Sequence, residues 1–217
     1  MDIFSRLSNP LLILYSLPGI LLGLVLHELG HALVADRLGD PTPRRMGRIS
    51  LNPLHHLNPI GTVMLILAGF GWAKPVVTDP RNYRTKRFGF ALVGIAGPLT
   101  NLILGLILMT VWLLLYKNGT IFNGDVAFEM LSYAVIINFS LCAFNLIPLP
   151  PLDGYNILKD SVLLRWNNSR FLWNIERYGQ FLLLALLIFP VTSGYISFVV
   201  GKLWDLGIWM LTPILGL

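Results

Sequence analysis

The chain has 217 residues, of which 55% are apolar and only 12% are charged, and its mean hydropathy is +0.68. About a quarter of the residues are charged in a soluble domain, so this composition excludes an ordinary soluble protein and indicates a membrane protein. The net charge of +5 comes from Lys and Arg scattered through short loops. That pattern sets membrane topology, and we therefore expect no binding of nucleic acid.

Six apolar segments follow one another along the chain, at 11–35, 60–71, 89–116, 129–148, 180–200 and 203–216. A helix that spans a bilayer needs about 20 mostly apolar residues. Segment 60–71 is too short to cross and contains three glycines, so we predict a re-entrant or interfacial piece. Segment 203–216 is also short, which leaves its crossing open. Pro190 and Gly194 predict a kink in the fifth segment.

We therefore predict an all-α polytopic membrane protein with about five to six transmembrane or re-entrant segments. The loops around 42–51 and 71–78 could form a small β element. One membrane-embedded domain should cover residues 1–217, with a core at about 11–160 and C-terminal helices at about 180–216. The first apolar run has no small-residue cleavage site, so we interpret it as an uncleaved span rather than a signal peptide.

Lys and Arg in the loops predict the orientation of the chain. Nine basic residues lie in 36–88 and four lie in 149–178, whereas 117–128 contains only Lys117. The two basic loops are therefore predicted in the cytoplasm, on condition that 60–71 does not cross. The N-terminus is then outside. We expect a multi-pass protein of the cell membrane, and any active site near the end of the first segment would lie nearer the cytoplasmic side.

The sequence His27-Glu28-Leu29-Gly30-His31 lies inside the first apolar segment. Residues four apart share one face of a helix, so both imidazoles can reach a single Zn²⁺. Glu28 then lies beside the metal, where it can act as the general base of a metalloprotease. Three ionisable residues within five positions of a span are costly unless they serve a function. The motif therefore favours a metal site over a polar patch between helices.

Catalytic zinc usually takes three protein ligands, and Asp153 is the predicted third. It ends the stretch Asn145-Leu-Ile-Pro-Leu-Pro-Pro-Leu-Asp153-Gly154 after the fourth segment, where three prolines stop the helix. The predicted topology places this end on the same side as His27 and His31. A simple Asp-Gly turn after a span is the alternative interpretation.

Four other ionisable residues are alternative candidates for metal ligands. His55 and His56 lie in a basic stretch that contains Pro and Asn, where interfacial or hydrogen-bonding roles are expected. Glu129 and Glu176 would supply the third ligand in a different membrane peptidase with the same helical motif, but neither has a metal-like neighbourhood. A metal carrier or a module that recruits membrane helices is the non-proteolytic alternative. In a carrier the ligands would open to both sides, and Glu28 would have no role.

Three further stretches complete the pattern: Leu152-Asp153-Gly154, Gly97-Pro98-Leu99-Thr100-Asn101 and Phe70-Gly71-Trp72-Ala73-Lys74-Pro75-Val76. Together with the His27–His31 motif they resemble the site-2 protease family of intramembrane zinc metalloproteases, over residues from about 20 to 160. The last stretch narrows the resemblance to short prokaryotic members. No PDZ or CBS domain of the kind found in many relatives fits in this chain.

The resemblance implies that His27, His31 and Asp153 bind Zn²⁺ and that Glu28 activates water. It also implies that Asn145 and Asn101 lie close to the site and bind the substrate or the oxyanion, although asparagine in a span often only hydrogen-bonds between helices. The segment 71–77 would be an edge strand for an extended substrate. The expected partners are the lipid bilayer and single-pass transmembrane substrates, cleaved in regulated intramembrane proteolysis. The sequence carries no signal for an oligomeric state.

Overall fold

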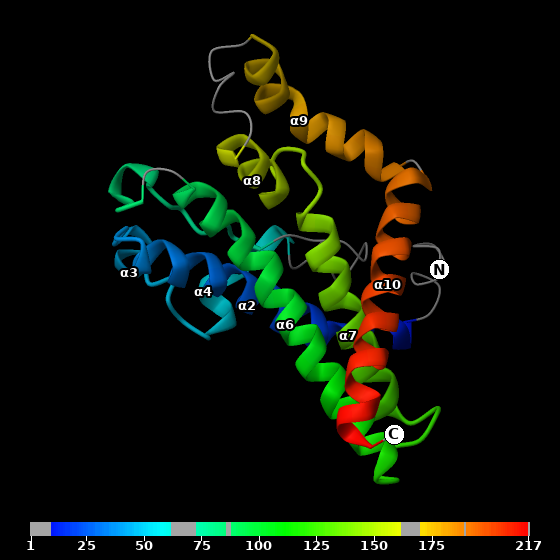
Figure 1. The fold of residues 1–217 in the computed structure, drawn as a ribbon. Coiled ribbons are helices and arrows are strands. Elements are labelled where there is room, and N and C mark those ends of the chain that lie inside the picture. Colours follow the sequence, from blue (N-terminus) through cyan, green and yellow to red (C-terminus); the bar gives the residue numbers. More distant parts are fainter. Residues whose placement is uncertain (1–9, 62–72, 86–87, 162–169, 189, 217) are drawn as a thin grey trace.

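The computed structural model (Figure 1) describes residues 10–61, 73–85, 88–161, 170–188 and 190–216. These residues form helices and loops, and none of them belongs to a β-strand. One isolated antiparallel bridge joins Leu57 to Ala73. The predicted all-α class is confirmed.

The prediction of a small β element in the loops around 42–51 and 71–78 is wrong for the described residues of both loops. In the first loop, Thr42–Arg45 form a helical turn, labelled α3, which begins with a proline. In the second loop, pairing stops at the bridge of Ala73. Pro75 follows two residues later and has no N–H to extend a ladder.

The described residues form eight further helical elements. In chain order the helices beside α3 are α2 (Pro10–Arg37), α4 (Pro53–His56), the 3₁₀ turn η1 (Pro80–Asn82), α6 (Gly89–Lys117), α7 (Val126–Asn145), α8 (Asp153–Ser161), α9 (Arg170–Ile188) and α10 (Pro190–Leu215).

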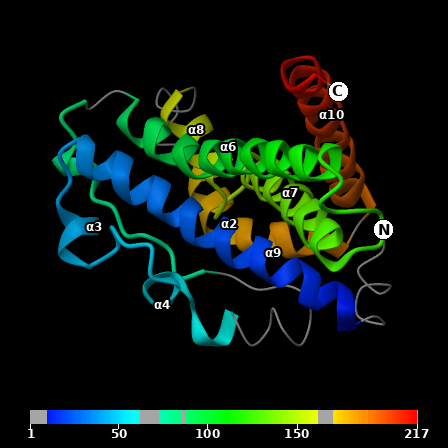
Figure 2. The same ribbon diagram turned by 90° about the horizontal axis from the view of Figure 1, so that it is seen from below.

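The centre of the molecule is a bundle of α2, α6 and α7, which pack against one another. Figure 2 shows α2 lying alongside α6, with α7 next to both. Small residues let the backbones approach: a Cβ at Gly19 would lie 2.6 Å from Cα of Ala134, and one at Gly105 would lie 2.5 Å from the ring of Phe139. Such contacts are typical of helices that pack within a membrane.

The helix α10 packs on one end of this bundle, where Met109, Leu113, Val135 and Phe139 form a buried cluster. Residues from its second half, including Leu211, lie against that cluster. Helix α8 lies at the opposite end of the bundle (Figure 1).

Among the described residues, four helices are long and apolar enough to cross a membrane: Leu11–Arg37, Gly89–Lys117, Val126–Asn145 and Val191–Leu215. The first three correspond to the predicted segments 11–35, 89–116 and 129–148. The predicted re-entrant piece at 60–71 lies almost entirely outside the described residues. The polytopic membrane architecture is confirmed.

The predicted division of the C-terminal residues was wrong. We expected a kinked segment at 180–200 and a short one at 203–216, but α9 ends at Ile188 and α10 continues unbroken from Pro190 to Leu215. Helix α10 passes through 201 and 202 without a break, so the last segment is long enough to cross. The kink predicted at Pro190 falls beside residue 189, which lies outside the described residues.

Candidate metal centre

The His27–His31 motif lies in the second half of α2 and faces α6. The two histidines are only 6% and 8% exposed, and their ring centroids are 4.7 Å apart. Gly97 of α6 leaves room for both rings, because a Cβ there would lie 2.6 Å from Cε1 of His27 and would overlap Nε2 of His31. The glycine before Pro98 is thus required by the space that the imidazoles occupy.

Asp153 is the first residue of α8, a few residues after α7 ends at Asn145. The start of α8 lies directly against the end of α7. A Cβ at Gly154 would overlap the backbone carbonyls of Leu146 and Ile147. Glycine is therefore needed at this position, and the tight packing directs the Asp153 side chain toward the histidines.

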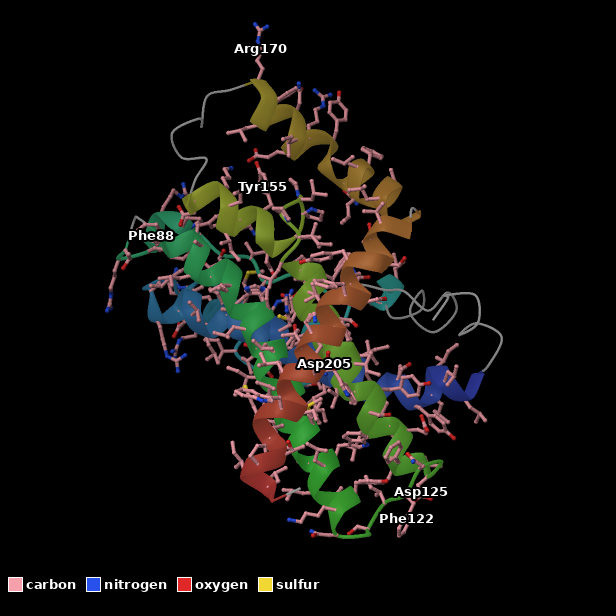
Figure 3. The ribbon with its side chains drawn as sticks, turned by 45° about the vertical axis from the view of Figure 1, so that its right-hand side comes forward. Phe88, Phe122, Asp125, Tyr155, Arg170 and Asp205 are labelled. Atoms are coloured by element: carbon pink, nitrogen blue, oxygen red, sulfur yellow. The ribbon has the colours of Figure 1, made fainter. Side chains whose placement is uncertain are left out.

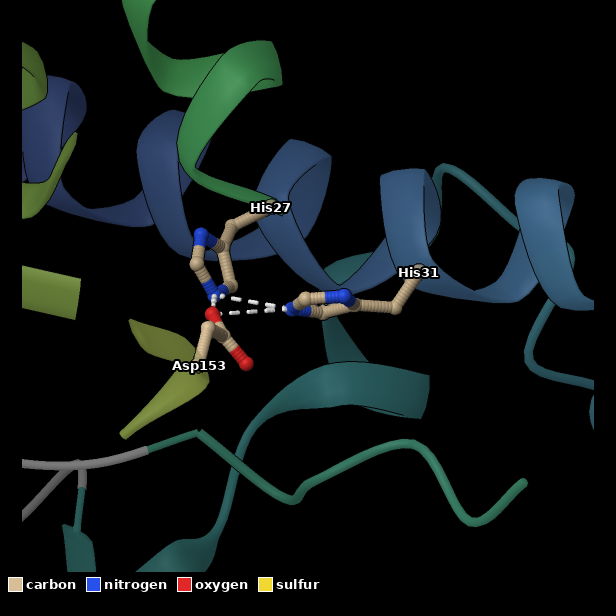
Figure 4. A group of neighbouring side chains, drawn as sticks. All are labelled: His27, His31 and Asp153. Atoms are coloured by element: carbon tan, nitrogen blue, oxygen red, sulfur yellow. Dashed lines mark hydrogen bonds and ion pairs between the residues drawn. The ribbon is translucent and has the colours of Figure 1, made fainter. Parts of the chain in front are cut away.

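The three side chains meet in a nearly equilateral triangle (Figure 4). Nε2 of His27 lies 3.1 Å from Nε2 of His31. Oδ2 of Asp153 lies 3.1 Å from the first of these nitrogens and 3.2 Å from the second. The three residues form a group that could hold a metal ion.

The hydrogen bonds of the two Nδ1 atoms, which point away from the triangle, indicate that the atoms inside the triangle are all hydrogen-bond acceptors. Nδ1 of His27 lies 2.7 Å from Oδ1 of Asn101, and Nδ1 of His31 lies 2.7 Å from the carbonyl of Val93. Both partners accept hydrogen bonds, so each neutral ring carries its proton on Nδ1 and directs an Nε2 lone pair inward.

Two lone pairs and a carboxylate that face one another need a cation between them. Zinc ligands about 2.0 to 2.2 Å from a tetrahedral ion are spaced about 3.3 Å apart, close to the observed separations. The residues present therefore fit Zn²⁺.

Asn101 is completely buried and lies behind His27 rather than on the wall of the pocket described below. Its Oδ1 accepts from the His27 ring, and its Nδ2 donates at 3.0 Å to the carbonyl of Gly23 and to Oδ1 of Asn138. Asn138 in turn donates at 2.8 Å to the carbonyl of Ala134. Each polar group of Asn101 thus has a partner within the bundle.

Asn138 was missed in the sequence analysis. It is completely buried in the middle of α7, and through Asn101 it connects α7 with the metal centre. Outer partners of this kind fix the orientation and tautomer of a metal-binding histidine. A lone asparagine in an apolar segment, as at Asn138, could have been noticed, but its partner 37 residues away is not apparent from spacing.

A pocket of about 230 Å³ opens beside the triangle. Its walls include Glu28, Asn145, Phe90 and Asn156. Val76, from the loop before η1, also lines the pocket. One carboxylate oxygen of Glu28 accepts a hydrogen bond of 2.9 Å from the backbone N–H of Val76. The predicted general base therefore lies at the pocket next to the predicted ligands, and so does Asn145.

The segment 74–79 runs across the site and is anchored at both ends. At one end, Lys74 N–H donates at 2.6 Å to the carbonyl of His56, and the buried Arg48 binds the carbonyl of Lys74 at 3.3 Å. At the other end, Asp79 N–H donates at 2.7 Å to the carboxylate of Asp40. The two anchors hold Val76 against Glu28.

Asp40 is completely buried. Burial alone would raise the pKa of this carboxyl, but hydrogen bonds from Thr42, the Asp79 backbone and Asn82 outweigh burial and lower the pKa. Asp40 therefore stays ionised and keeps its anchoring role at neutral pH.

The alternative ligands lie elsewhere. His55 and His56 bond to the backbone carbonyls of Gly47 and Ser50. Glu176 of α9 accepts from Tyr155 and Lys159 of α8, and the hydrogen bond with Lys159 lowers the pKa of Glu176.

Glu129 is in the first turn of α7. It lies 16 residues, or about 24 Å of helix, from the end of α7 that leads to Asp153. Among the described residues, none of these four side chains belongs to the metal-binding group.

The helix α8 is held on α6 by a buried carboxylate. Asp160, 7% exposed, accepts a hydrogen bond of 2.9 Å from the N–H of Ala91 in the first turn of α6. Gly94, one turn further, lies against the backbone oxygen of Asp153 and the side chain of Asn156. These contacts fix the start of α8 relative to α6.

Comparison with known proteins places this architecture in a family. The model of peptidase family M50 matches residues 115–189, a range that includes Asp153 but lies after the His27–His31 motif. No solved structure matches the chain.

Curated relatives align over most of the chain. The putative zinc metalloprotease YwhC of Bacillus subtilis is 38% identical over 178 residues, which cover 80% of both chains. Rip2 of Mycobacterium tuberculosis, with the same descriptive name, is 31% identical over 195 residues, 87% of this chain and 72% of that protein. Zinc metalloprotease MJ0392 of Methanocaldococcus jannaschii is 28% identical over 83% of this chain and 44% of its own length.

Apolar spanning helices around a buried His-His-Asp triangle define an intramembrane zinc metalloprotease. With the similarity to YwhC over four fifths of each chain, the chain belongs to peptidase family M50. The resemblance to site-2 proteases and the expectation of Zn²⁺ are confirmed.

Proposed function

We propose that the chain is an endopeptidase that hydrolyses peptide bonds within or near the transmembrane segments of single-pass membrane proteins. The observation that carries this proposal is the triangle of His27, His31 and Asp153 with Glu28 beside it. Two of these ligands lie in a helix long and apolar enough to span a bilayer. Three protein ligands beside an open pocket match the plan of a catalytic zinc site.

In this proposal Nε2 of both histidines and the carboxylate of Asp153 hold Zn²⁺, which when bound supplies Lewis-acid chemistry to the hydrolysis. Glu28 takes a proton from the attacking water. It then donates this proton to the amine that leaves when the peptide bond breaks. The N–H of Val76 binds one oxygen of Glu28 at 2.9 Å, which leaves the other oxygen for the water.

The two asparagines have different roles in this proposal. Asn145 lies on the pocket wall, where its side chain can contact the substrate backbone. Asn101 lies outside the wall and positions His27 through their bond of 2.7 Å. Because the carbonyls of a substrate helix are already hydrogen-bonded, the helix must unwind locally before attack. Helix-breaking residues near the cut should therefore favour cleavage.

The cut should lie in the cytoplasmic half of the substrate span. His27 follows Leu11, the first residue of the span, by 16 residues, or about 24 Å at 1.5 Å per residue. A hydrocarbon core is about 30 Å thick. The zinc site is then nearer the end of α2 that leads into the basic loop at 36–88, which the positive-inside rule assigns to the cytoplasm.

A co-expression experiment tests this function. The probe is a tagged single-span protein with an Asn-Pro pair in the cytoplasmic half of its span, and the matched control carries the pair in the outer half. We expect the wild type to cleave the first probe faster and Glu28→Gln to cleave neither, with the bond located by mass spectrometry. Equal processing by wild type and Glu28→Gln would contradict proteolysis and favour a helix-recruiting role. Cleavage only in the outer half would contradict the orientation.

A further inference from the structure

One face of α10 packs on the bundle and the opposite face is open. The inward side chains, which lie against the cluster around Met109 and Phe139, are Val200, Leu203, Trp204, Ile208, Leu211 and Leu215. Gly207 on the same side would place a Cβ 2.5 Å from Sδ of Met109. Among the described residues, none on the other side of α10 belongs to the set that packs on this cluster.

The outward residues form a continuous stripe with spacings of three and four. The stripe consists of Val191, Gly194, Phe198, Gly201, Asp205 and Trp209. Val191 and Trp209 are each 73% exposed and Phe198 is 65% exposed. A Cβ at Gly194 or Gly201 would meet only open space. Alternation of three and four is the seam pattern of helices that pack side by side, and the glycines allow a close approach.

Two ionisable residues lie in the middle of this face. Lys202 and Asp205 are the twelfth and fifteenth residues of the 25-residue span that begins at Val191, and Figure 3 places Asp205 midway along α10. Both side chains are exposed. The Lys202 ammonium lies 5.8 Å from the ring centroid of Phe198. Within the described part of the chain neither residue forms an ion pair, and such groups in a span are costly unless they are paired.

We propose that this face of α10 docks on the same face of a second copy of the chain. Lys202 and Asp205 are one turn apart, with a rise of about 4.5 Å. A two-fold axis along the membrane normal brings Lys202 of each copy beside Asp205 of the other. Such an isologous interface pairs both charges at once. An apolar substrate helix on this face would leave both unpaired, so charge complementarity favours the second copy.

Disulfide cross-linking in native membranes tests the contact. The background is Cys142→Ala, since Cys142 is the only native cysteine. Phe198→Cys on the stripe should form a covalent dimer. Met210→Cys, also exposed (44%) but about 120° away around the helix, is the matched control and should not. Equal cross-linking at both positions, or none at Phe198→Cys, would overturn the proposal.

Charge reversal tests the pairing itself. With Phe198→Cys present, Lys202→Glu alone and Asp205→Lys alone should each lose the covalent dimer, because each places like charges face to face. Co-expression of these two variants should restore it as a mixed dimer, detected with two different tags. Cross-linking of either single variant at the wild-type level, or absence of the mixed dimer while both chains are found in the membrane fraction, would contradict the pairing. The comparison of Phe198→Cys with Met210→Cys does not depend on the reversed variants.

Discussion

At the scale of single residues, groups outside the His27, His31 and Asp153 triangle orient the proposed zinc ligands. Asn101 binds Nδ1 of His27, and the carbonyl of Val93 binds Nδ1 of His31. These bonds set which nitrogen of each ring is free. The two predicted substrate-binding asparagines are therefore separated by geometry, because Asn145 lines the pocket and Asn101 is buried behind a histidine.

Replacement of Asn101 should weaken zinc binding. Asn101→Leu removes the acceptor for His27 Nδ1–H, and loss of such an outer partner lowers metal affinity by about 10- to 100-fold. Competition with a chelating dye measures this affinity on the purified protein. Asn145→Ala is the matched control and should keep wild-type affinity while it slows cleavage. Unchanged zinc affinity in Asn101→Leu would rule out the positioning role.

The backbone of Val76 should matter more than its side chain. Val76→Pro removes the N–H that binds Glu28, so the carboxylate loses its orientation and the cleavage rate should fall by about tenfold or more. Val76→Ala keeps the N–H and should cleave at nearly the wild-type rate. Zinc content should be unchanged in both variants. Equal rates for the proline and alanine variants would mean that the hydrogen bond has no role in catalysis.

Much of this site was predictable because its signals are local in sequence. His27, Glu28 and His31 lie within five residues, and the prolines before Asp153 mark a helix end. The supporting contacts were not predictable, because they join residues that are far apart: 37 positions separate Asn101 from Asn138, and 48 separate Glu28 from Val76. No spacing rule relates such residues before the helices are packed.

At the scale of elements, α6 organises the site through its first turns. Ala91 binds Asp160, Val93 orients His31, and Gly97 leaves space for both imidazoles. The residue before α6, Phe88, supplies no side-chain cap. The carboxylate of Asp160 in α8 accepts a hydrogen bond from the first turn of α6 instead. A carboxylate at a helix N-terminus is also favoured by the helix dipole.

Loss of Asp160 should loosen Asp153. Asp160→Ala removes the acceptor that ties α8 to α6, and we expect zinc to dissociate about tenfold faster, as for other outer contacts of a metal site. Asp160→Asn keeps an acceptor and should restore most of the wild-type rate. Asp125→Ala, which removes a carboxylate bound to a backbone N–H in the loop before α7, controls for loss of such a bond elsewhere. Identical zinc release from Asp160→Ala and wild type would contradict this link.

The elements also show where prediction from sequence fails. Hydropathy located α2, α6 and α7, because each is a long apolar run between polar loops. It misplaced the bounds of the last two helices. Helix α9 combines apolar and polar residues along its length, and Gly201 and Lys202, which interrupt the apolar run in the sequence, lie inside α10.

At the scale of the whole molecule, the site and the loop between α6 and α7 lie at opposite ends. Figure 3 places Phe88 and Tyr155 toward one end, and Phe122 and Asp125 at the other. The described parts of the basic loops, among them Arg48 and Lys74, are at the end that carries the site. This polarity supports the proposed orientation, in which the site lies nearer the cytoplasm.

Cysteine labelling of intact cells should test this orientation. In a Cys142→Ala background, cysteines at Arg45 and Arg84 should be protected from a membrane-impermeant maleimide, and a cysteine at Asn123 should react. Permeabilised cells, in which all three should react, are the control. Labelling of Arg45→Cys and Arg84→Cys on opposite sides would mean that the intervening chain crosses the membrane.

The zinc content of purified variants tests the central claim most directly. Wild type and Glu28→Gln should each hold one zinc per chain, because Glu28 is proposed as a base and not a ligand. His27→Ala, His31→Ala and Asp153→Ala should each lose most of it, since each removes one of three donors, whereas His55→Ala and His56→Ala should keep it. Full zinc occupancy in Asp153→Ala, or loss of zinc in Glu28→Gln, would contradict the proposed centre.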